Sequence, residues 1–307
     1  MPLSPELQAV ADELATLYQE AQDDLRAKLA AILDDPNEAR QRARLRELAR
    51  SIEATRTSLV DGTRTWLEGQ VPALHAAGAT VGAEAAGTVF AWSAPHVEAV
   101  QALAAQVWGE VAPNLLDLST STRQAIRDLT RASARDVLLE GQSAAGASAT
   151  LERWMVDQGI GTVTYANGAK HLAADYADTL SRTVTANAYN EGTFTQAAVD
   201  GFGWMEVFDG PDCGWASHDD PDKANGTVRT LDECRTHSLS HPRCARNFAP
   251  RPDVATQGQA DATRSGEGQA VAAASERLRA QSATRTLTGR TRAPRVARTP
   301  RQPRTRA

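Results

Sequence analysis

The chain has few cysteines, which cross-link small proteins, and few aromatic residues, which fill their cores. Of 307 residues only three are cysteine and 5% are aromatic, and no apolar run approaches the roughly 20 residues of a membrane span. Three cysteines cannot all pair, and the N-terminus lacks the charged start and apolar core of a secretory signal. We therefore expect no disulfide framework, no membrane contact and synthesis in the cytoplasm. A Walker-type phosphate loop and a GxSxG nucleophile elbow are also missing.

Charge is distributed unevenly along the chain. The net charge is −5, but residues 255–307 carry eleven arginines and no lysine against three acidic residues, a net +8, which leaves −13 for residues 1–254. An acidic body with a basic tail indicates two different partners. The tail has no apolar period, so we expect it to be disordered and to contact DNA phosphates. Its DNA-contacting arginines are expected to be Arg285, Arg290, Arg292, Arg295, Arg298, Arg301, Arg304 and Arg306.

Helical periodicity dominates the first two thirds of the chain. Ser4 and Pro5 are typical of a helix start, and apolar residues at helical spacing continue to Leu33. Asp35-Pro36-Asn37 should break this helix, and a second one should end at Gly62. A helix holding Trp66 should stop before Pro72 or at Gly78, and a helix of small residues should follow over 79–92. Two more helices are expected, one over 97–111 closed by Pro113 and one from Leu118 to about Gly141.

Two helical surfaces allow more than one interpretation. The first two helices are amphipathic, and we favour packing on each other over a docking arm for a partner helix. Arg123, Arg127, Arg131 and Arg135 lie four residues apart and form one stripe on a helix. We favour a solvated face paired with Asp128 and Asp136 for this stripe, and phosphate binding is the alternative.

The end of the body changes from helical to alternating patterns. A long helix is expected over about 166–202, interrupted at Asn190-Glu191-Gly192, followed by strands over 204–208 and 226–230 and a short helix from Leu231. The fold class is therefore mainly α with a small C-terminal α+β module, a short β-hairpin carrying a Cys/His loop. The expected domains are residues 1–117, 118–254 and the tail, 255–307.

All three cysteines and three of the six histidines lie between residues 209 and 250. Cys213 and His218 form one close pair, and His241 and Cys244 form another, with a loop rich in Asp, Gly and Asn between them. Two close pairs joined by a loop are typical of a tetrahedral zinc site. Cys234 or His237 could replace one ligand. The alternative is a loop held by hydrogen bonds, in which His241-Pro242 only makes a turn.

Residues 120–254 resemble the Mu F-like phage head morphogenesis family, also called minor capsid proteins. The matching motifs are Arg182-Thr183, Asn190-Glu191-Gly192, the aromatic strand 204–208, the loop 209–213 and the closing His-Pro-x-Cys-x-Arg at 241–246. Residues 165–168 (Tyr-Ala-Asn-Gly) and 213–215 (Cys-Gly-Trp) are closest to versions from phages of actinobacteria. Many members have a Cys-x2-Cys near the first cysteine, and this chain lacks it.

The resemblance implies a structural protein of a tailed-phage head that contacts the portal or the major capsid protein. The protein would lie first in the host cytoplasm and then in the capsid interior, where its tail would contact packaged DNA. It also implies that the helix carrying Arg182 packs beside the loop, so that Arg182 could hold Asp209 or Asp212. We expect no catalysis. The alternatives are a metal-dependent nuclease of the His-Asn-His type, using His218-Asp219-Asp220 and His241, and a non-specific DNA-binding module.

Overall fold

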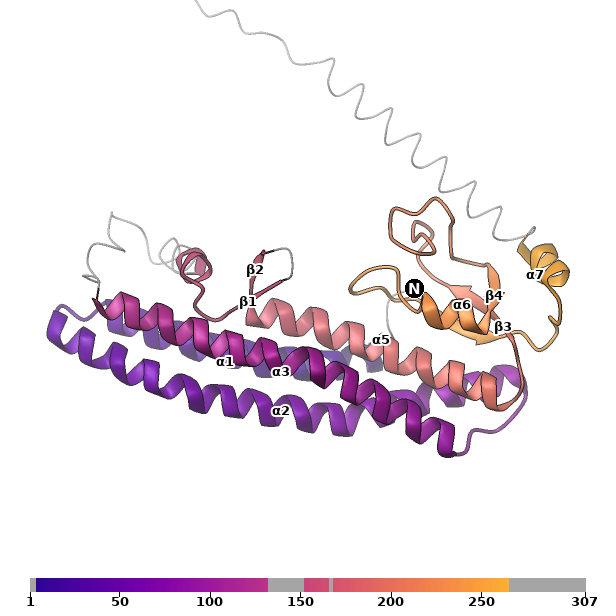
Figure 1. The fold of residues 1–307 in the computed structure, drawn as a ribbon, viewed down its shortest axis with the longest axis horizontal. Helices are drawn as coiled ribbons and strands as arrows, with labels where there is room; N and C mark the ends of the chain where they lie inside the picture. Colours follow the sequence, from indigo (N-terminus) through magenta and orange to yellow (C-terminus); the bar gives the residue numbers. More distant parts are fainter. Residues whose placement is uncertain (1–3, 132–151, 166–167, 265–307) are drawn as a thin grey trace, which may run out of the picture.

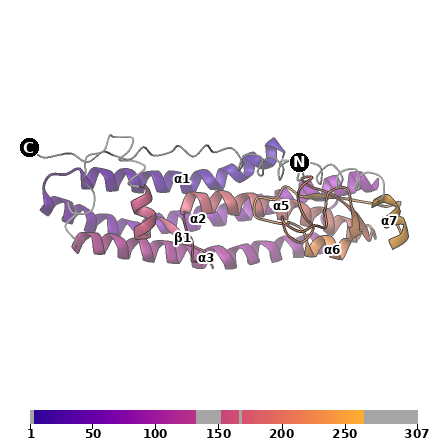
Figure 2. The ribbon, with the colours of Figure 1, turned by 90° about the horizontal axis from the view of Figure 1, so that it is seen from above.

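The protein is an elongated helical bundle with a small mixed module at one end (Figure 1). The computed structural model describes residues 4–131, 152–165 and 168–264. Four long helices lie side by side along the long axis in both views (Figures 1 and 2) and are called the body here. They are α1 (Pro5–Leu33), α2 (Glu38–Ala86), α3 (Ala94–Arg131) and α5 (Ala173–Val199).

The remaining elements are short and lie mostly after the body. Residues 152–158 are helical and precede the hairpin of β1 (Thr162–Thr164) and β2 (Lys170–Leu172). The C-terminal module, residues 204–264, contains an antiparallel sheet of order β4-β3-β5. Its elements are β3 (Trp204–Phe208), β4 (Val228–Thr230), α6 (Leu231–Thr236), β5 (Asn247–Pro250) and α7 (Gln257–Arg264).

Local sequence sets the first helix boundaries as predicted. The Ser4 hydroxyl accepts a hydrogen bond from the Leu7 amide (3.3 Å) and caps α1. Asn37 caps α2 in the same way, accepting from the Arg40 amide (3.0 Å). These side chains satisfy amides that have no partner inside the first turn of a helix. The break at 35–37 and the packing of α1 on α2 are confirmed.

Several predicted helix ends are wrong because tertiary packing overrides local helix breakers. Pro72 and Gly62 lie inside the 49-residue α2, and Pro113 lies inside α3, which runs on through Leu118. Apolar faces on both sides of each breaker are buried in one core, and this burial outweighs a lost hydrogen bond. The predicted domain boundary at 117/118 falls within α3, and the residues on either side of it share that core.

The close approach of α2 and α5 explains why α5 is not interrupted at Asn190-Glu191-Gly192. A Cβ atom at Gly192 would lie 2.0 Å from the His75 carbonyl oxygen, and one at Gly78 would lie 1.8 Å from the Tyr189 carbonyl oxygen. Each glycine therefore admits the backbone of the other helix. Small residues are used here for contact between helices, so the expected interruption of α5 is wrong.

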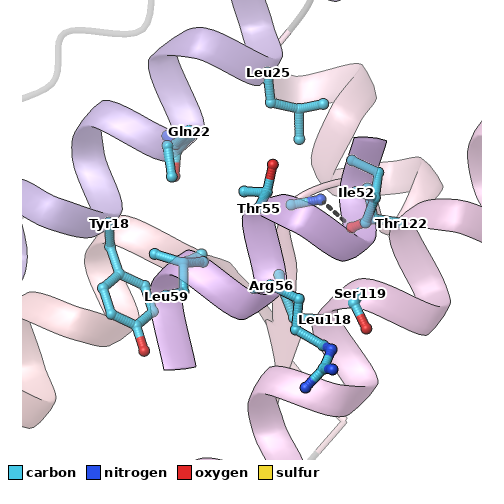
Figure 3. A pocket seen from close by; sticks show the side chains of 13 residues that line it. Tyr18, Gln22, Leu25, Ile52, Thr55, Arg56, Leu59, Leu118, Ser119 and Thr122 are labelled. Atoms are coloured by element: carbon cyan, nitrogen blue, oxygen red, sulfur yellow. Dashed lines mark hydrogen bonds between the residues drawn. The ribbon is translucent and has the colours of Figure 1, made fainter. Parts of the chain in front are cut away.

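The body is built around two apolar clusters. The larger joins α1, α2, α3 and α5, with Val71, Val111 and Ala177 fully buried. The smaller lies at the end of the body where α1 ends and α2 begins, around Leu29, Leu45 and Ile126. Between α1, α2 and α3 a mostly apolar hollow remains, shown in Figure 3, next to the hydrogen bond from the Gly161 amide to the Thr122 hydroxyl (2.8 Å).

The strand predictions are confirmed for β3 and β4, and two strand features were missed. The hairpin β1–β2 was not predicted, and α5 begins at Ala173 rather than near residue 166. β5 adds a third strand, so the expected hairpin is a three-stranded sheet. The sheet packs on α5 through rings of Phe194 and Phe248, whose centroids are 4.7 Å apart.

The predicted disorder from residue 255 is wrong for its first ten residues. α7 packs Ala260 against Val228 and Val254. The eight arginines expected to contact DNA lie outside the described residues. Across the described ranges, none of the helices combines the length and apolar character needed to cross a membrane.

Candidate metal centre

Two loops of the C-terminal module bring the predicted ligands together. The first loop, residues 209–227, joins β3 to β4 and carries Cys213 and His218. The second loop, residues 237–246, joins α6 to β5 and carries His241 and Cys244. Because β3 pairs with both β4 and β5, both loops begin or end at the same sheet.

The second loop presents its two ligands from a tight turn. The Cys244 amide donates to the His241 carbonyl (3.1 Å), and the turn has Pro242 at its second position and Arg243 at its third. Arg243 has φ of 63°, the left-handed conformation that a type II turn requires and that usually falls to glycine. Its guanidinium forms an ion pair with Asp178 of α5. This contact holds a strained residue, so the turn is anchored to the long helix.

The first loop is shaped by its own polar groups. The Asp220 carboxylate accepts hydrogen bonds from the amides of Ala216 and Asp222, both 3.0 Å, and these bonds lower the pKa of Asp220. Lys223 donates to the carbonyl oxygens of Asp212 (3.0 Å) and Asp220 (3.2 Å). The Asp220 carboxylate, bound to backbone amides, and the Asp212 carbonyl, bound to the Lys223 side chain, therefore build the loop that places Cys213.

The donors nearest each other have the spacing of zinc ligands. Cys213 Sγ lies 3.6 Å from His241 Nε2. Zinc–sulfur and zinc–nitrogen bonds of about 2.3 and 2.05 Å at tetrahedral angles separate the two ligand atoms by about 3.6 Å. His241 Nδ1 lies 2.7 Å from the Pro242 carbonyl oxygen, which only accepts, so Nδ1 carries the hydrogen. The lone pair of neutral His241 is then on Nε2, facing Cys213, as in metal sites with an oriented histidine.

Two overlapping groups of donors surround Cys213. In one, donor atoms of Cys213, His218 and His241 all lie within 4.8 Å of one another, and in the other those of Asp209, Cys213 and Cys244 do. The rings of His218 and His241 meet edge to face with centroids 5.1 Å apart. The four predicted ligands do not form a single group at that distance, and Cys213 is the residue common to both groups.

The donor set suits zinc. Thiolate and imidazole are the ligands that structural zinc sites use, and Cys213 with His218 and His241 provides three of the usual four. Cys244 and Asp209 are the candidates for the fourth position. Burial, the Asp209 carboxylate and Cys244 raise the pKa of the Cys213 thiol to about 11, so zinc would bind by displacing a proton. A bound zinc ion would fasten the two loops to each other.

The two reserve ligands lie elsewhere. Cys234 is fully buried in the apolar cluster beneath the sheet, where burial raises the pKa of its thiol. His237 packs its ring against Trp215, with centroids 5.1 Å apart. Neither belongs to a group of metal donors among the described residues.

Arg246 holds the site together, and sequence reasoning missed this role. Its side chain is fully buried and donates to Asp209 Oδ2 (2.6 Å), whose side chain is 2% exposed. It also donates to the carbonyl oxygens of Gly214 (2.6 Å), Trp215 (3.0 Å) and His237 (2.7 Å). One guanidinium therefore binds both loops. In the structure alternate residues from Cys244 through β5 are buried, and this alternation places Arg246 inside, but no local sequence pattern reveals its partners.

The predicted contact of Arg182 with Asp209 or Asp212 is wrong. Arg182 donates to Asp178 (2.8 Å) and to Asp12 of α1 (3.0 Å). Asp178 also binds Arg243, so Arg182 reaches the second loop only through that shared carboxylate. The reason is geometric: Arg182 lies on the face of α5 turned towards α1, while Arg246 enters the site from the end of the second loop.

Asparagines of α5 tie the module to the body. Asn190 is buried and donates to the Arg246 carbonyl (2.8 Å), and Asn187 accepts from the Ser238 hydroxyl (3.1 Å). Glu191 forms an ion pair with Arg235 of α6 (3.4 Å). The Asn-x-Gly segment thus works as a docking edge, with Asn190 facing the loops and Gly192 facing α2.

No protein-family model, curated protein or solved structure matches this chain. The likeness to phage head morphogenesis proteins stays a prediction carried by the motifs.

Proposed function

We propose that the protein is a minor structural component of a tailed-phage head. The elongated body would contact the portal or the major capsid protein, and the arginine-rich tail would contact packaged DNA. The protein would be made in the host cytoplasm and would end inside the capsid. The Cys/His module would be a zinc-fastened structural element in this proposal, with no catalytic role.

One observation carries the proposal: the motifs behind the family resemblance are joined by two sets of contacts between α5 and the loops of the module. Asn190 binds the backbone of Arg246, Arg246 binds Asp209, and Arg243 and Arg182 share Asp178. These residues are spread over more than sixty positions of the sequence. Contacts among these motif residues support a shared architecture, because they give the motif residues a structural role in holding the module together.

The arrangement of the donors favours a structural over a catalytic centre. A hydrolytic metal needs an open position for water or substrate. Here Asp209 and Cys244 lie beside Cys213 and can fill that position, and Asp220 is committed to backbone amides. The nuclease alternative predicts plasmid cleavage by the purified protein with Mg²⁺ or Mn²⁺. We expect no cleavage.

The test of the head assignment is the composition of purified particles. DNA-filled heads, washed at high salt and analysed by mass spectrometry, should contain the protein at a few copies per head. A phage lacking it should give a lower infectious yield with heads of normal shape, and a supplied copy should restore the yield. Absence of the protein from washed heads, together with unchanged yield, would contradict the proposal.

The tail is tested separately by truncation. Because α7 packs on the module, the cut belongs after Arg264 rather than at residue 255. The full chain should bind duplex DNA weakly, without sequence preference and less at high salt, and most of this binding should be lost on truncation. Equal affinity of the two proteins would show that the tail is not the DNA contact.

A further inference from the structure

A groove lined by arginines lies at the end of the body away from the Cys/His module. It is formed by the first third of α2 and the last third of α3, which run in opposite directions at the end of the bundle (Figure 1). The lining residues are Arg46, Ala49, Arg50, Glu53, Arg123 and Arg127. About 40 Å of α2 separates Arg50 from His75, near the module end.

The groove has far more positive than negative charge. Four guanidinium groups face one carboxylate, and Glu53 is already shared between Arg56 (2.5 Å) and Arg123 (2.6 Å). Among the described residues, Arg46, Arg50 and Arg127 form no ion pair. Elsewhere in the body, Arg26 and Arg182 each hold carboxylates.

One guanidinium in the groove has an unused donor in a buried position. The Nε of Arg123 is buried and has no hydrogen-bond partner among the described residues. A buried unpaired donor is unfavourable, so the Arg123 side chain gains from any movement that brings this Nε to an acceptor oxygen in the groove. Arg131, by contrast, pairs with Asp128 (2.8 Å), as predicted for a solvated face. The predicted stripe is therefore divided, with Arg123 and Arg127 in the groove. Arg135 and Asp136 lie outside the described residues.

The arrangement suits a ligand with repeated anionic groups. Arg46 and Arg50 lie four residues apart on α2, as do Arg123 and Arg127 on α3, which gives two rows with a spacing of about 6 Å along each helix. The planar fork of arginine matches the oxygens of a phosphate. Like charges at this spacing repel one another, so an anion between the rows would relieve the repulsion.

We propose that this groove binds the sugar-phosphate backbone of duplex DNA. It gives the ordered body a DNA contact of its own, at the end opposite the Cys/His module. An acidic segment of another protein also offers bidentate carboxylates, but it fits less well because a duplex presents its charges at a fixed repeat along a stiff rod, which two rows on rigid helices can meet. The inference goes beyond the proposed function, because DNA binding by the groove does not depend on the phage-head assignment.

The experiment must separate the groove from the tail. We use the full chain with glutamine at the eight tail arginines Arg285, Arg290, Arg292, Arg295, Arg298, Arg301, Arg304 and Arg306. In this background Arg50→Gln/Arg127→Gln removes two groove charges. The control Lys28→Gln/Lys170→Gln removes two charges from exposed positions outside the groove. Binding of a 20-base-pair duplex is measured by fluorescence anisotropy over a series of salt concentrations.

The groove variant should bind about tenfold more weakly at low salt, and its slope of log K against log salt should fall by about 1.8, two phosphate contacts. The control should match the parent. Equal affinity and slope in both double variants would overturn the proposal. So would displacement of DNA by a polyglutamate of equal charge at lower concentration, which would assign the groove to an acidic protein.

A second measurement needs no variant. Phenylglyoxal modifies exposed arginines, and duplex DNA should protect Arg50 and Arg127 in the tail-neutralised parent while Arg40 and Arg131 stay reactive. Uniform reactivity with and without DNA would overturn the proposal even if the double variant failed to fold.

Discussion

The body and the C-terminal module are stabilised by different means. The body buries Leu, Val, Ile and Ala from four long helices in two apolar clusters. The module has a small apolar cluster, and its two loops are held by the buried Arg246–Asp209 pair, carbonyl contacts and a group of Cys and His donors. Apolar burial is non-directional and tolerant, whereas a buried polar network depends on every partner. We therefore expect the module to fail locally while the body stays folded.

Loss of a metal ligand should give the largest difference in stability between the module and the body. Structural zinc contributes roughly 10 kcal/mol or more in small zinc-binding domains. Cys213→Ala should reduce zinc, measured by mass spectrometry, from about one ion per chain towards none. It should expose the first loop to protease, with little change in the helical circular dichroism. Cys234→Ala is the matched control, because that thiol lies in the apolar cluster, and zinc should be retained.

Two further variants identify the fourth ligand. Cys244→Ala should lower zinc content if its thiolate completes the site, and Asp209→Asn should do so if the carboxylate does. A metal-free protein with an equally protected loop would contradict the zinc hypothesis, and Arg246 and the Asp220 turn would then hold the loops without metal.

Removal of Arg246 should have the next largest effect. Arg246→Met leaves the Asp209 carboxylate buried without its partner, at a cost of about 3–5 kcal/mol. Hydrogen exchange should accelerate in both loops, while amides of α2 and α3 keep their protection. Arg251→Met is the control, because the ion pairs of Arg251 with Glu206 and Asp253 are partly exposed. We expect this variant to lose about 1 kcal/mol of stability at most.

The pair Arg246–Asp209 can be tested by a double variant. Adding Asp209→Asn to Arg246→Met removes the buried charge and should recover part of the lost protection. If Arg246→Met alone leaves exchange in the loops unchanged, the module does not depend on this pair.

A substitution at the α2–α5 contact should affect the body instead. A methyl group at Gly78 would lie 1.8 Å from the Tyr189 carbonyl oxygen, so Gly78→Ala should force the helices apart and cost about 3 kcal/mol. Gly69 lies in the same helix with no atom within 4 Å of its Cβ position. Gly69→Ala should stabilise the body by about 0.5–1 kcal/mol because alanine favours the helix. Urea unfolding followed by the helical circular dichroism signal should give a lower free energy of unfolding for Gly78→Ala than for Gly69→Ala. Similar free energies for the two variants would refute the close contact.

The smallest expected effect is a pH dependence of the body. His75 and His96 are fully buried and hydrogen-bonded to each other (2.9 Å). Burial and the neighbouring His96 lower the pKa of His75 to about 4, and burial also lowers the pKa of His96, against opposing effects of Gln196 and Asp200. The unfolded chain therefore binds more protons between pH 6.5 and 4, so stability falls as pH falls through this range.

For His75 the loss is about 2 kcal/mol at pH 5 relative to pH 8. His75→Gln should flatten this dependence in urea unfolding measured at several pH values. His171→Gln, at an exposed position, should leave the dependence unchanged. An identical pH profile in wild type and His75→Gln would show that this histidine is not held neutral in the folded body.

Capping residues, amphipathic periodicity and strand alternation were enough to predict the predominance of helices, the break at 35–37, β3 with β4 and the short α6. They failed at Pro72, Pro113 and residues 190–192, because local preferences are weaker than burial on both sides of the residue. The strand β5 was missed because its alternation is short and follows a turn. The Cys/His pairs were visible by spacing alone, but the separation of Cys234 and His237 from them was not.

The sequence by itself determined that the chain is mainly helical, which segment concentrates the possible metal donors and where positive charge gathers in the tail. These properties depend on neighbours within a few residues, and periodicity records them. Only the tertiary structure decided that Arg246, rather than Arg182, holds Asp209, that Gly78 and Gly192 admit facing backbones, and that arginines of α2 and α3 line one groove. Such contacts join residues far apart in the chain, and their energies depend on burial and direction, which no local pattern encodes.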